Sequence, residues 1–215
     1  MRLILIRHGE TEHNRGKITL GRADVPLNEH GMRQARAIAA SFHRPPDAIY
    51  TSPLERCAST ARAIGIATAC DAVIEPGLIE MDVGEMEHLT GAELRERYPE
   101  FLRVWMSDAA ADARMPGGGT ADARMPGGET LAEVQARAWE AVERMAAAHP
   151  DGEVVAVTHN FVIRTLVCRV LGLPLARFRA FTISVASRSV IDIGGRGPAL
   201  VALNDTAHLR AAGLG

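Results

Sequence analysis

The sequence predicts an α/β protein, a three-layer sandwich in which helices cover both faces of a mostly parallel sheet. Short apolar segments at 3–6, 48–51 and 154–157 have the length and the β-branched content of buried strands, and helical segments separate them. Strands that alternate with helices are typical of a parallel sheet, because the helix returns the chain to the start of the next strand. Apolar segments at 190–193 and 200–203 predict two further strands.

Two helices are predicted in the first third of the chain. The segment from Asn28 to about Phe42 has apolar residues at helical spacing, which we expect to face the core: Met32, Ala35, Ile38 and Ala39. The second helix follows the strand at 48–51. We expect Ser52 to be its N-cap, with Pro53 in the first helical position and Glu55 closing a capping box.

Two more helices are predicted in the second half. The segment 131–148 is amphipathic, and Thr130 with Glu133 forms the pattern of a capping box at its start. The segment from about 161 to 171 follows a strand and ends before Gly172, a residue that often terminates helices.

Residues 80–130 differ from the rest because they are rich in Glu, Gly and Met and have weak periodicity. We expect them to form an insertion that covers the sheet edge over the active site, within a single domain spanning 1–215. Inside this insertion, residues 111–118 recur as 121–128. One tandem copy is too short for a repeat architecture, so we interpret it as a duplication in a tolerant surface loop.

Composition excludes several classes of function. The net charge of −2 gives no basic face for nucleic acid, and no apolar segment is long enough to span a membrane. Of the 24 basic residues only Lys17 is a lysine, and its position fits neither a Schiff base nor a phosphate-binding loop. Three cysteines without a metal-binding or disulfide pattern favour the reducing cytoplasm. The sequence leaves a homodimer open.

Basic and histidine residues follow three of the predicted strands. Arg7 and His8 follow the first strand, Arg56 lies shortly after the second, and His159 follows the third. Because ligands bind at the carboxyl ends of strands in such sheets, we expect these side chains to meet. The paired N–H donors of an arginine guanidinium and the backbone N–H groups at a helix N-terminus both bind the oxygens of a phosphoryl group. The alternatives are a metal site built from two histidines and a carboxylate, or histidines that are merely part of the core.

The segment Arg7-His8-Gly9-Glu10-Thr11 with Asn14 resembles the R-H-G-E-T-x-x-N signature of the histidine phosphatase superfamily, which has the phosphoglycerate mutase-like fold. Further segments resemble motifs of that family in the same order along nearly the whole chain: 21–35, 51–61, 78–87, 126–130, 157–164 and 204–209. A single R-H-G is weak evidence, whereas the ordered set is specific.

The resemblance implies a mechanism. His8 would form a phosphohistidine, with the proton on its other ring nitrogen held by an acceptor such as a backbone carbonyl. Glu80 would act as general acid and then as general base. His159 would assist the phosphoryl group together with the expected phosphate-binding set of Arg7, Asn14, Gly21, Arg56 and Asn160. The resemblance implies neither a metal nor another cofactor.

The function expected from these residues is that of a metal-independent phosphatase acting on small phosphomonoesters. The alternatives are a phosphoglycerate mutase and an inactive phosphate-binding module. Leu20, the pair Asn160-Phe161, and His88 depart from the family pattern near the expected leaving group. These departures leave the substrate open among sugar phosphates, phosphoglycerate derivatives, nucleotides and phosphoserine.

Overall fold

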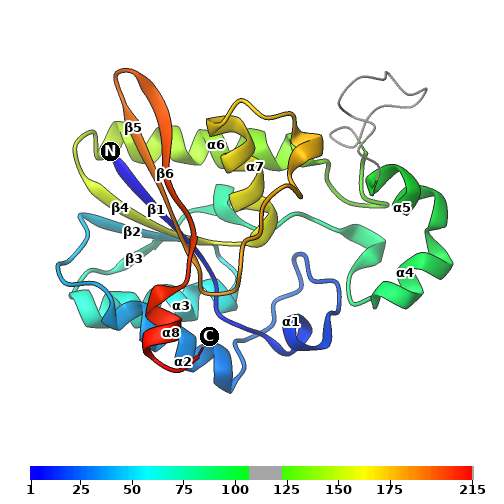
Figure 1. Cartoon of the computed structure of the whole chain (residues 1–215), viewed down its shortest axis with the longest axis horizontal. Coiled ribbons are helices and arrows are strands. Elements are labelled where there is room, and N and C mark those ends of the chain that lie inside the picture. The colour runs from blue at the N-terminus through cyan, green and yellow to red at the C-terminus, as the bar shows by residue number, and fades with distance from the viewer. Residues whose placement is uncertain (107–122, 215) are drawn as a thin grey trace.

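The five apolar segments predicted as strands all belong to one six-stranded sheet (Figure 1). A computed structural model of the chain describes residues 1–106 and 123–214. The strands of the sheet are β1 (Arg2–Arg7), β2 (Ala48–Thr51), β3 (Ala72–Ile74), β4 (Glu153–Thr158), β5 (Arg188–Gly194) and β6 (Gly197–Asp205).

The strand order is β3-β2-β4-β1-β5-β6, which confirms the mostly parallel sheet. Strands β3, β2, β4 and β1 run parallel, while β5 and β6 continue the sheet in antiparallel pairing. The two central strands β1 and β4 pair in a register that sets Arg7 opposite Thr158. The residues that follow these strands, His8 and His159, therefore leave the sheet side by side.

Helices cover both faces of the sheet, as the three-layer prediction requires (Figure 1). Helices α6 (Leu131–Ala148) and α7 (Asn160–Val170) pack on one face, and α2 (Glu29–Ala40), α3 (Glu55–Thr68) and the short α8 (Ala207–Ala211) lie on the other. Each face buries its own apolar cluster. Because alternate strand residues point to opposite faces, Leu5 belongs to one cluster and Ile6 to the other, and both are fully buried.

The capping box of α6 is confirmed. Thr130 accepts a hydrogen bond from the backbone N–H of Glu133, whose carboxylate accepts one from the backbone N–H of Thr130. Helix α7 ends near the expected place, since Gly172 follows it with a φ of +64°. The prediction for Met32 is wrong: its side chain is 38% exposed on the solvent side of α2.

The prediction of Ser52 as an N-cap is also wrong. Helix α3 begins at Glu55, its N-cap is Leu54, and no side chain caps it. The Ser52 hydroxyl accepts a local hydrogen bond from the backbone N–H of Leu54 at 3.3 Å and also lies 2.7 Å from Nε2 of His159. The local contact that the sequence pattern indicates is therefore present, but it precedes the helix, and the same hydroxyl contacts a buried imidazole from a distant strand end.

The predicted insertion is described over 80–106 and 123–130. It contains a single-turn helix, η2 (Gly84–Met86), and two short helices, α4 (Gly91–Arg97) and α5 (Pro99–Trp105). The first copy of the repeat, 111–118, lies outside the described residues. The end of the second copy packs against the η2 segment, because the backbone N–H of Glu85 donates to the carbonyl of Pro126 at 2.8 Å. A Cβ on Gly84 would lie 2.1 Å from that same carbonyl oxygen, so this position requires glycine.

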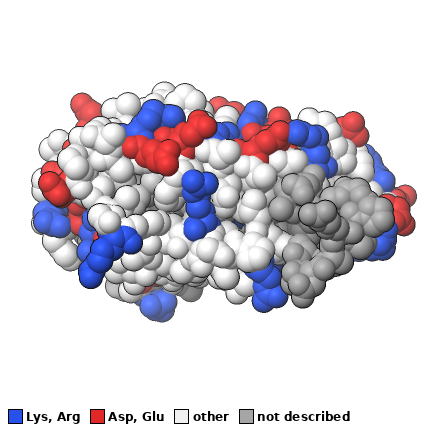
Figure 2. Space-filling view, turned by 90° about the horizontal axis from the view of Figure 1, so that it is seen from above, with Lys and Arg blue, Asp and Glu red and all other residues white. Residues whose placement is uncertain are grey.

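The remaining elements are short: α1 (Glu12–Gly16) and the single-turn helices η1 (Pro76–Leu78) and η3 (Leu175–Arg177). Within the described residues, no helix combines the length and the hydropathy needed to cross a bilayer. On the face shown in Figure 2, acidic and basic side chains are interspersed, which agrees with the net charge of −2.

Candidate active site

The carboxyl ends of β1, β2 and β4 converge on a cavity of about 260 Å³. Arg7 ends β1 and His8 follows it, while the loop after β2 leads into the first turn of α3 and delivers Arg56. The residues that line the cavity are Arg7, His8, Asn14, Ile18, Thr19, Leu20, Arg56, Glu80, Asn160 and Phe161. The topology thus gathers residues that are more than 150 positions apart in the sequence.

His8 is held in one tautomer. Its Nδ1 lies 2.7 Å from the carbonyl oxygen of Gly9, an acceptor, so Nδ1 carries the proton and Nε2 keeps its lone pair. The side chain is almost fully buried. Burial lowers the pKa of His8 well below its usual value, and the charges of Arg7 and Arg56 lower it further. At neutral pH the ring is therefore uncharged.

Arg7 and Arg56 supply fixed positive charge around His8. Nη1 of Arg7 donates to the carbonyl of Ile183 at 2.6 Å, and the two amino groups of Arg56 donate to the carbonyls of Ala23 and Gly21. In each arginine Nε is buried and has no hydrogen-bond partner in the structure. Unpaired buried donors are costly, and an anionic ligand would accept from them. Burial lowers the pKa of Arg7 to about 10, which still leaves it charged at neutral pH.

His159 lies beside His8 and is fully buried. The two ring centroids are 5.2 Å apart. Nε2 of His159 lies 2.7 Å from Oγ of Ser52 and 3.3 Å from Sγ of Cys57. Burial lowers the pKa of His159 well below its usual value, and the charge of Arg56 adds to this. The site therefore contains two neutral imidazoles between two charged guanidinium groups.

Glu80 is the one carboxyl group among the residues that line the cavity. Its Oε1 accepts from the backbone N–H of Met81 at 2.9 Å, and its Oε2 lies 3.4 Å from the backbone nitrogen of Phe161. Burial raises the pKa of Glu80 above its ordinary value, although the Met81 N–H and the charge of Arg56 act in the opposite direction. A carboxyl group with a raised pKa can carry the proton that a departing alkoxide needs.

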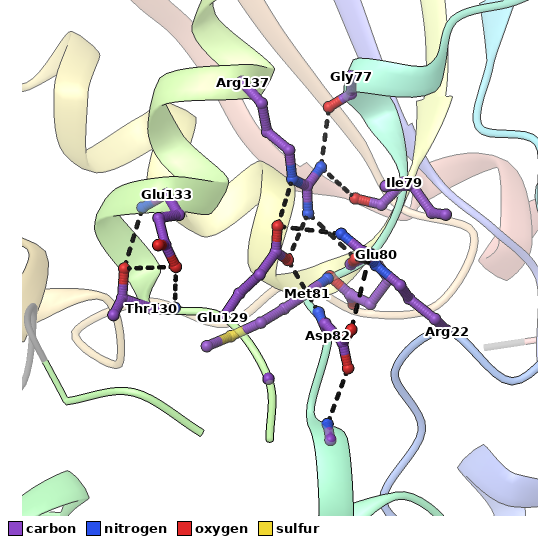
Figure 3. Close-up of polar contacts among 12 residues, drawn as sticks. Arg22, Gly77, Ile79, Glu80, Met81, Asp82, Glu129, Thr130, Glu133 and Arg137 are labelled. Atoms are coloured by element: carbon purple, nitrogen blue, oxygen red, sulfur yellow. Dashed lines mark hydrogen bonds and ion pairs between the residues drawn. The ribbon is translucent and has the colours of Figure 1, made fainter. Parts of the chain in front are cut away.

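A network of ion pairs fixes the segment that carries Glu80 (Figure 3). Nε and Nη2 of Arg137 in α6 donate to the two carboxylate oxygens of Glu129 at 3.0 and 3.1 Å. The same guanidinium donates to the carbonyls of Gly77, Ile79 and Glu80 at 3.0, 2.6 and 3.0 Å. Arg22 approaches from the other side, pairs with Glu129 at 3.0 Å and donates to the Glu80 carbonyl at 3.3 Å. The backbone of the acidic residue is thus bound by two arginines.

Of the other predicted residues, some line the cavity and one supports a residue that lines it. Asn14 and Asn160 line it. The carboxamide oxygen of Asn14 accepts from Thr11, so its NH2 group is the one that can donate to a substrate. Gly21 is placed differently: its backbone N–H donates to Glu87 at 2.7 Å, and its carbonyl holds Arg56. Gly21 therefore contacts the site through Arg56.

The roles of several supporting residues have no distinct signal in the sequence. The carboxylate of Glu87 accepts from the backbone N–H groups of 21, 22 and 23, and so shapes the loop that holds Arg56. Gly31 lets α2 approach the His8 loop, since a Cβ there would lie 2.1 Å from the carbonyl oxygen of Glu10. Neither Glu87 nor Arg137 could be assigned a partner without coordinates. Family motifs mark the position of Glu87 but not its role.

The rival metal site requires three suitable ligands close together. In the described part of the chain, no group of three or more His, Cys, Asp or Glu side chains is arranged to hold a metal ion. His8 and His159 have arginines and a single carboxyl group as neighbours, which is a set of groups suited to an anion.

Comparison with known proteins identifies the family. The model of the histidine phosphatase superfamily (branch 1) matches residues 3–206. This chain belongs to that superfamily. It is 34% identical to phosphoserine phosphatase 1 of Hydrogenobacter thermophilus, over 97% of this chain and 94% of that protein. It is 31% identical to a probable phosphoglycerate mutase of Serratia proteamaculans, over 89% of this chain and 85% of that protein.

Solved structures give the same result. A putative alpha-ribazole-5'-P phosphatase from Escherichia coli superposes with a TM-score of 0.81 at 28% identity, covering 95% of this chain and 96% of that one. The resemblance inferred from the ordered motifs is therefore confirmed. As a member of the histidine phosphatase superfamily with phosphatases among its relatives, the protein is a phosphoric monoester hydrolase.

Proposed function

We propose that this histidine phosphatase hydrolyses small phosphomonoesters without a metal ion, through a phosphohistidine on His8 with Glu80 as general acid and base. One observation carries the proposal: a neutral imidazole with a free Nε2 shares a single cavity with a carboxyl group of raised pKa. The three free cysteines among the described residues fit the reducing cytoplasm.

In the first step, Nε2 of His8 attacks phosphorus and the bond to the ester oxygen breaks. Glu80 gives its proton to that oxygen, so the alcohol part of the substrate leaves as a neutral alcohol while the phosphoryl group stays on His8. The Nε–H groups of Arg7 and Arg56, which have no hydrogen-bond partner in the structure, donate to the phosphoryl oxygens. Stabilising the charge on these oxygens is the main catalytic requirement of phosphoryl transfer.

In the second step, Glu80 is a carboxylate and takes a proton from a water molecule that attacks the phosphohistidine. The P–N bond breaks, inorganic phosphate is released, and His8 returns to its neutral form. His159 contributes as a neighbour whose pKa rises when a phosphate dianion occupies the cavity, because an adjacent negative charge favours the protonated ring.

The test is turnover of simple phosphomonoesters by purified protein in the presence of a chelator. The wild-type protein should hydrolyse them, and His8→Ala should reduce the rate to background while the circular dichroism spectrum stays unchanged. Dependence on an added divalent metal would contradict the metal-independent mechanism.

The mutase alternative uses the same phosphohistidine but excludes water and binds a phosphoglycerate carboxylate. The charged residues that line the cavity are Arg7, Arg56 and Glu80, and each has a role at the phosphoryl group. The next cation, Arg164, lines the adjoining cavity and already donates to Asn160 and to the carbonyl of Phe178. Phosphatase activity should therefore exceed mutase flux primed with 2,3-bisphosphoglycerate. A mutase flux far above hydrolysis would reverse this assignment.

A further inference from the structure

The position of Glu80 indicates the side of the cavity on which the leaving group lies. This inference rests on the proposed function, in which Glu80 protonates the ester oxygen. Oε2 of Glu80 lies 3.4 Å from the backbone nitrogen of Phe161. The ester oxygen must lie within hydrogen-bond distance of this carboxyl group. The alcohol part of the substrate therefore extends along Phe161.

Outside the phosphoryl site the lining of this cavity carries no charge. Ile18, Leu20 and Phe161 are apolar, and Asn14, Thr19 and Asn160 are polar. A substrate with an ammonium group beside the ester finds no anionic partner in this lining other than Glu80, which acts on the ester oxygen. Burying an unpaired charge costs several kcal/mol, so such substrates should be poor.

A second cavity of about 350 Å³ adjoins the first, and Phe161 and Asn160 line both. The second cavity is also lined by Phe178, Phe181, Thr182 and two arginines, Arg164 and Arg179. The guanidinium of Arg164 is fixed, since Nε donates to Asn160 at 2.9 Å and Nη1 donates to the carbonyl of Phe178 at 2.6 Å. Its central carbon lies 5.9 Å from the ring centroid of Phe181.

Aromatic residues are concentrated at this place although they make up only 4% of the chain. Four of the five phenylalanines and one of the two tryptophans gather here: Phe101, Trp105, Phe161, Phe178 and Phe181. Trp105 and Phe178 are buried and account for packing, whereas Phe161 and Phe181 are only partly buried. The rings of these last two residues are available at the cavity wall.

We infer that the substrate is a phosphomonoester of an aromatic alcohol whose ring packs on Phe161 and extends toward Phe181 and Arg164. Offset or edge contacts between rings and the face of a guanidinium both favour a planar group in this place. Phe161 and Phe181 are specificity-determining residues in this arrangement. Phosphoserine, which carries an ammonium group beside the ester, is disfavoured.

The experiment compares 2-phenylethyl phosphate, ethyl phosphate and O-phosphoserine. All three are esters of primary alcohols, so differences in leaving-group chemistry are small and do not favour the aromatic ester. The wild-type kcat/KM should be about tenfold or more higher for 2-phenylethyl phosphate than for either of the others. In Phe161→Leu and in Phe181→Leu, the ratio of kcat/KM for 2-phenylethyl phosphate to that for ethyl phosphate should fall several-fold. Phe42→Leu, on the opposite face of the sheet, is the matched control and should keep the wild-type ratio.

The inference is overturned if O-phosphoserine is turned over as well as 2-phenylethyl phosphate, or if neither variant changes the ratio. Two variants are included because Phe161 lies in the first turn of α7 and its replacement could affect folding, whereas Phe181 lies outside the helices and strands. Absence of turnover with all three esters would instead overturn the proposed function, and the two failures are thus distinguishable.

Discussion

Arg137 fixes the backbone of Glu80 from a distance, and replacing it with lysine tests whether that support matters. The arginine makes five hydrogen bonds, two to Glu129 and three to carbonyls of the segment 77–80. A lysine ammonium has three donors and no fork, so at least two of these bonds are lost. Each is charge-assisted and worth about 1.5–3 kcal/mol.

Solvent reduces this loss, because the side chain of Arg137 is 20% exposed and water can replace part of the contact. We expect Arg137→Lys to lower the free energy of unfolding by about 2–4 kcal/mol. The carboxyl group of Glu80 would also be less well positioned. The value of kcat/KM should fall by about 10- to 100-fold for an alkyl phosphate, which needs the acid, and by much less for p-nitrophenyl phosphate.

The assays are urea denaturation and steady-state kinetics with both esters. The matched control is Arg144→Lys on the same helix, where the side chain is 55% exposed and pairs with Glu75 at 2.8 Å. This control should change stability by no more than about 0.5 kcal/mol. If the two variants behave alike in stability and in their dependence on the leaving group, the ion-pair network does not position the acid and the reasoning is refuted.

Three further predictions concern the site. Glu80→Gln should lower kcat/KM for alkyl phosphates by about 100-fold or more and spare p-nitrophenyl phosphate; equal losses for both esters would argue against Glu80 as the acid. Because the pKa of Glu80 is raised and that of His8 is lowered, kcat/KM should be high between the two values, falling on the alkaline side as Glu80 loses its proton and on the acid side only well below pH 6.5. A pH-rate profile of Glu80→Gln should lack the alkaline limb, and its persistence would assign that limb to another group. Gly31→Ala should destabilise the protein by about 1–3 kcal/mol, because the new Cβ meets the Glu10 carbonyl, whereas Gly194→Ala, with open space around it, should not; equal denaturation midpoints would show that the α2 contact adapts.

The parts of the site that were predictable are those carried by strand ends. His8, Arg56 and His159 each follow a short apolar strand, and parallel pairing brings such ends to one edge. The acceptor for Nδ1 of His8 was also expected to be a backbone carbonyl, and it is that of Gly9. Topology rules are sufficient for the residues at strand ends, whereas the acceptor for His8 was expected from the family resemblance.

The parts that were not predictable depend on contacts between distant residues. Ser52 has the local pattern of an N-cap and accepts from the N–H of Leu54, but the helix begins only at Glu55, and the contact of its hydroxyl with the buried ring of His159, 107 positions away, has no local signal. Arg137 resembles any charged residue on an amphipathic helix, and only the fold shows that it binds the Glu80 segment. The short β3 and α1 were missed because three to five residues carry too little periodicity.

Direct detection of the phosphoryl group on His8 tests the central claim. Protein mixed with a [32P]phosphomonoester and quenched within one turnover should contain label that is stable in alkali and released by acid, and peptide mapping should place it in the segment 7–15. His8→Ala should carry no label, whereas His159→Ala should retain some. Stoichiometric label in His8→Ala, or label on a hydroxyl residue instead, would contradict the assignment of His8 as the nucleophile.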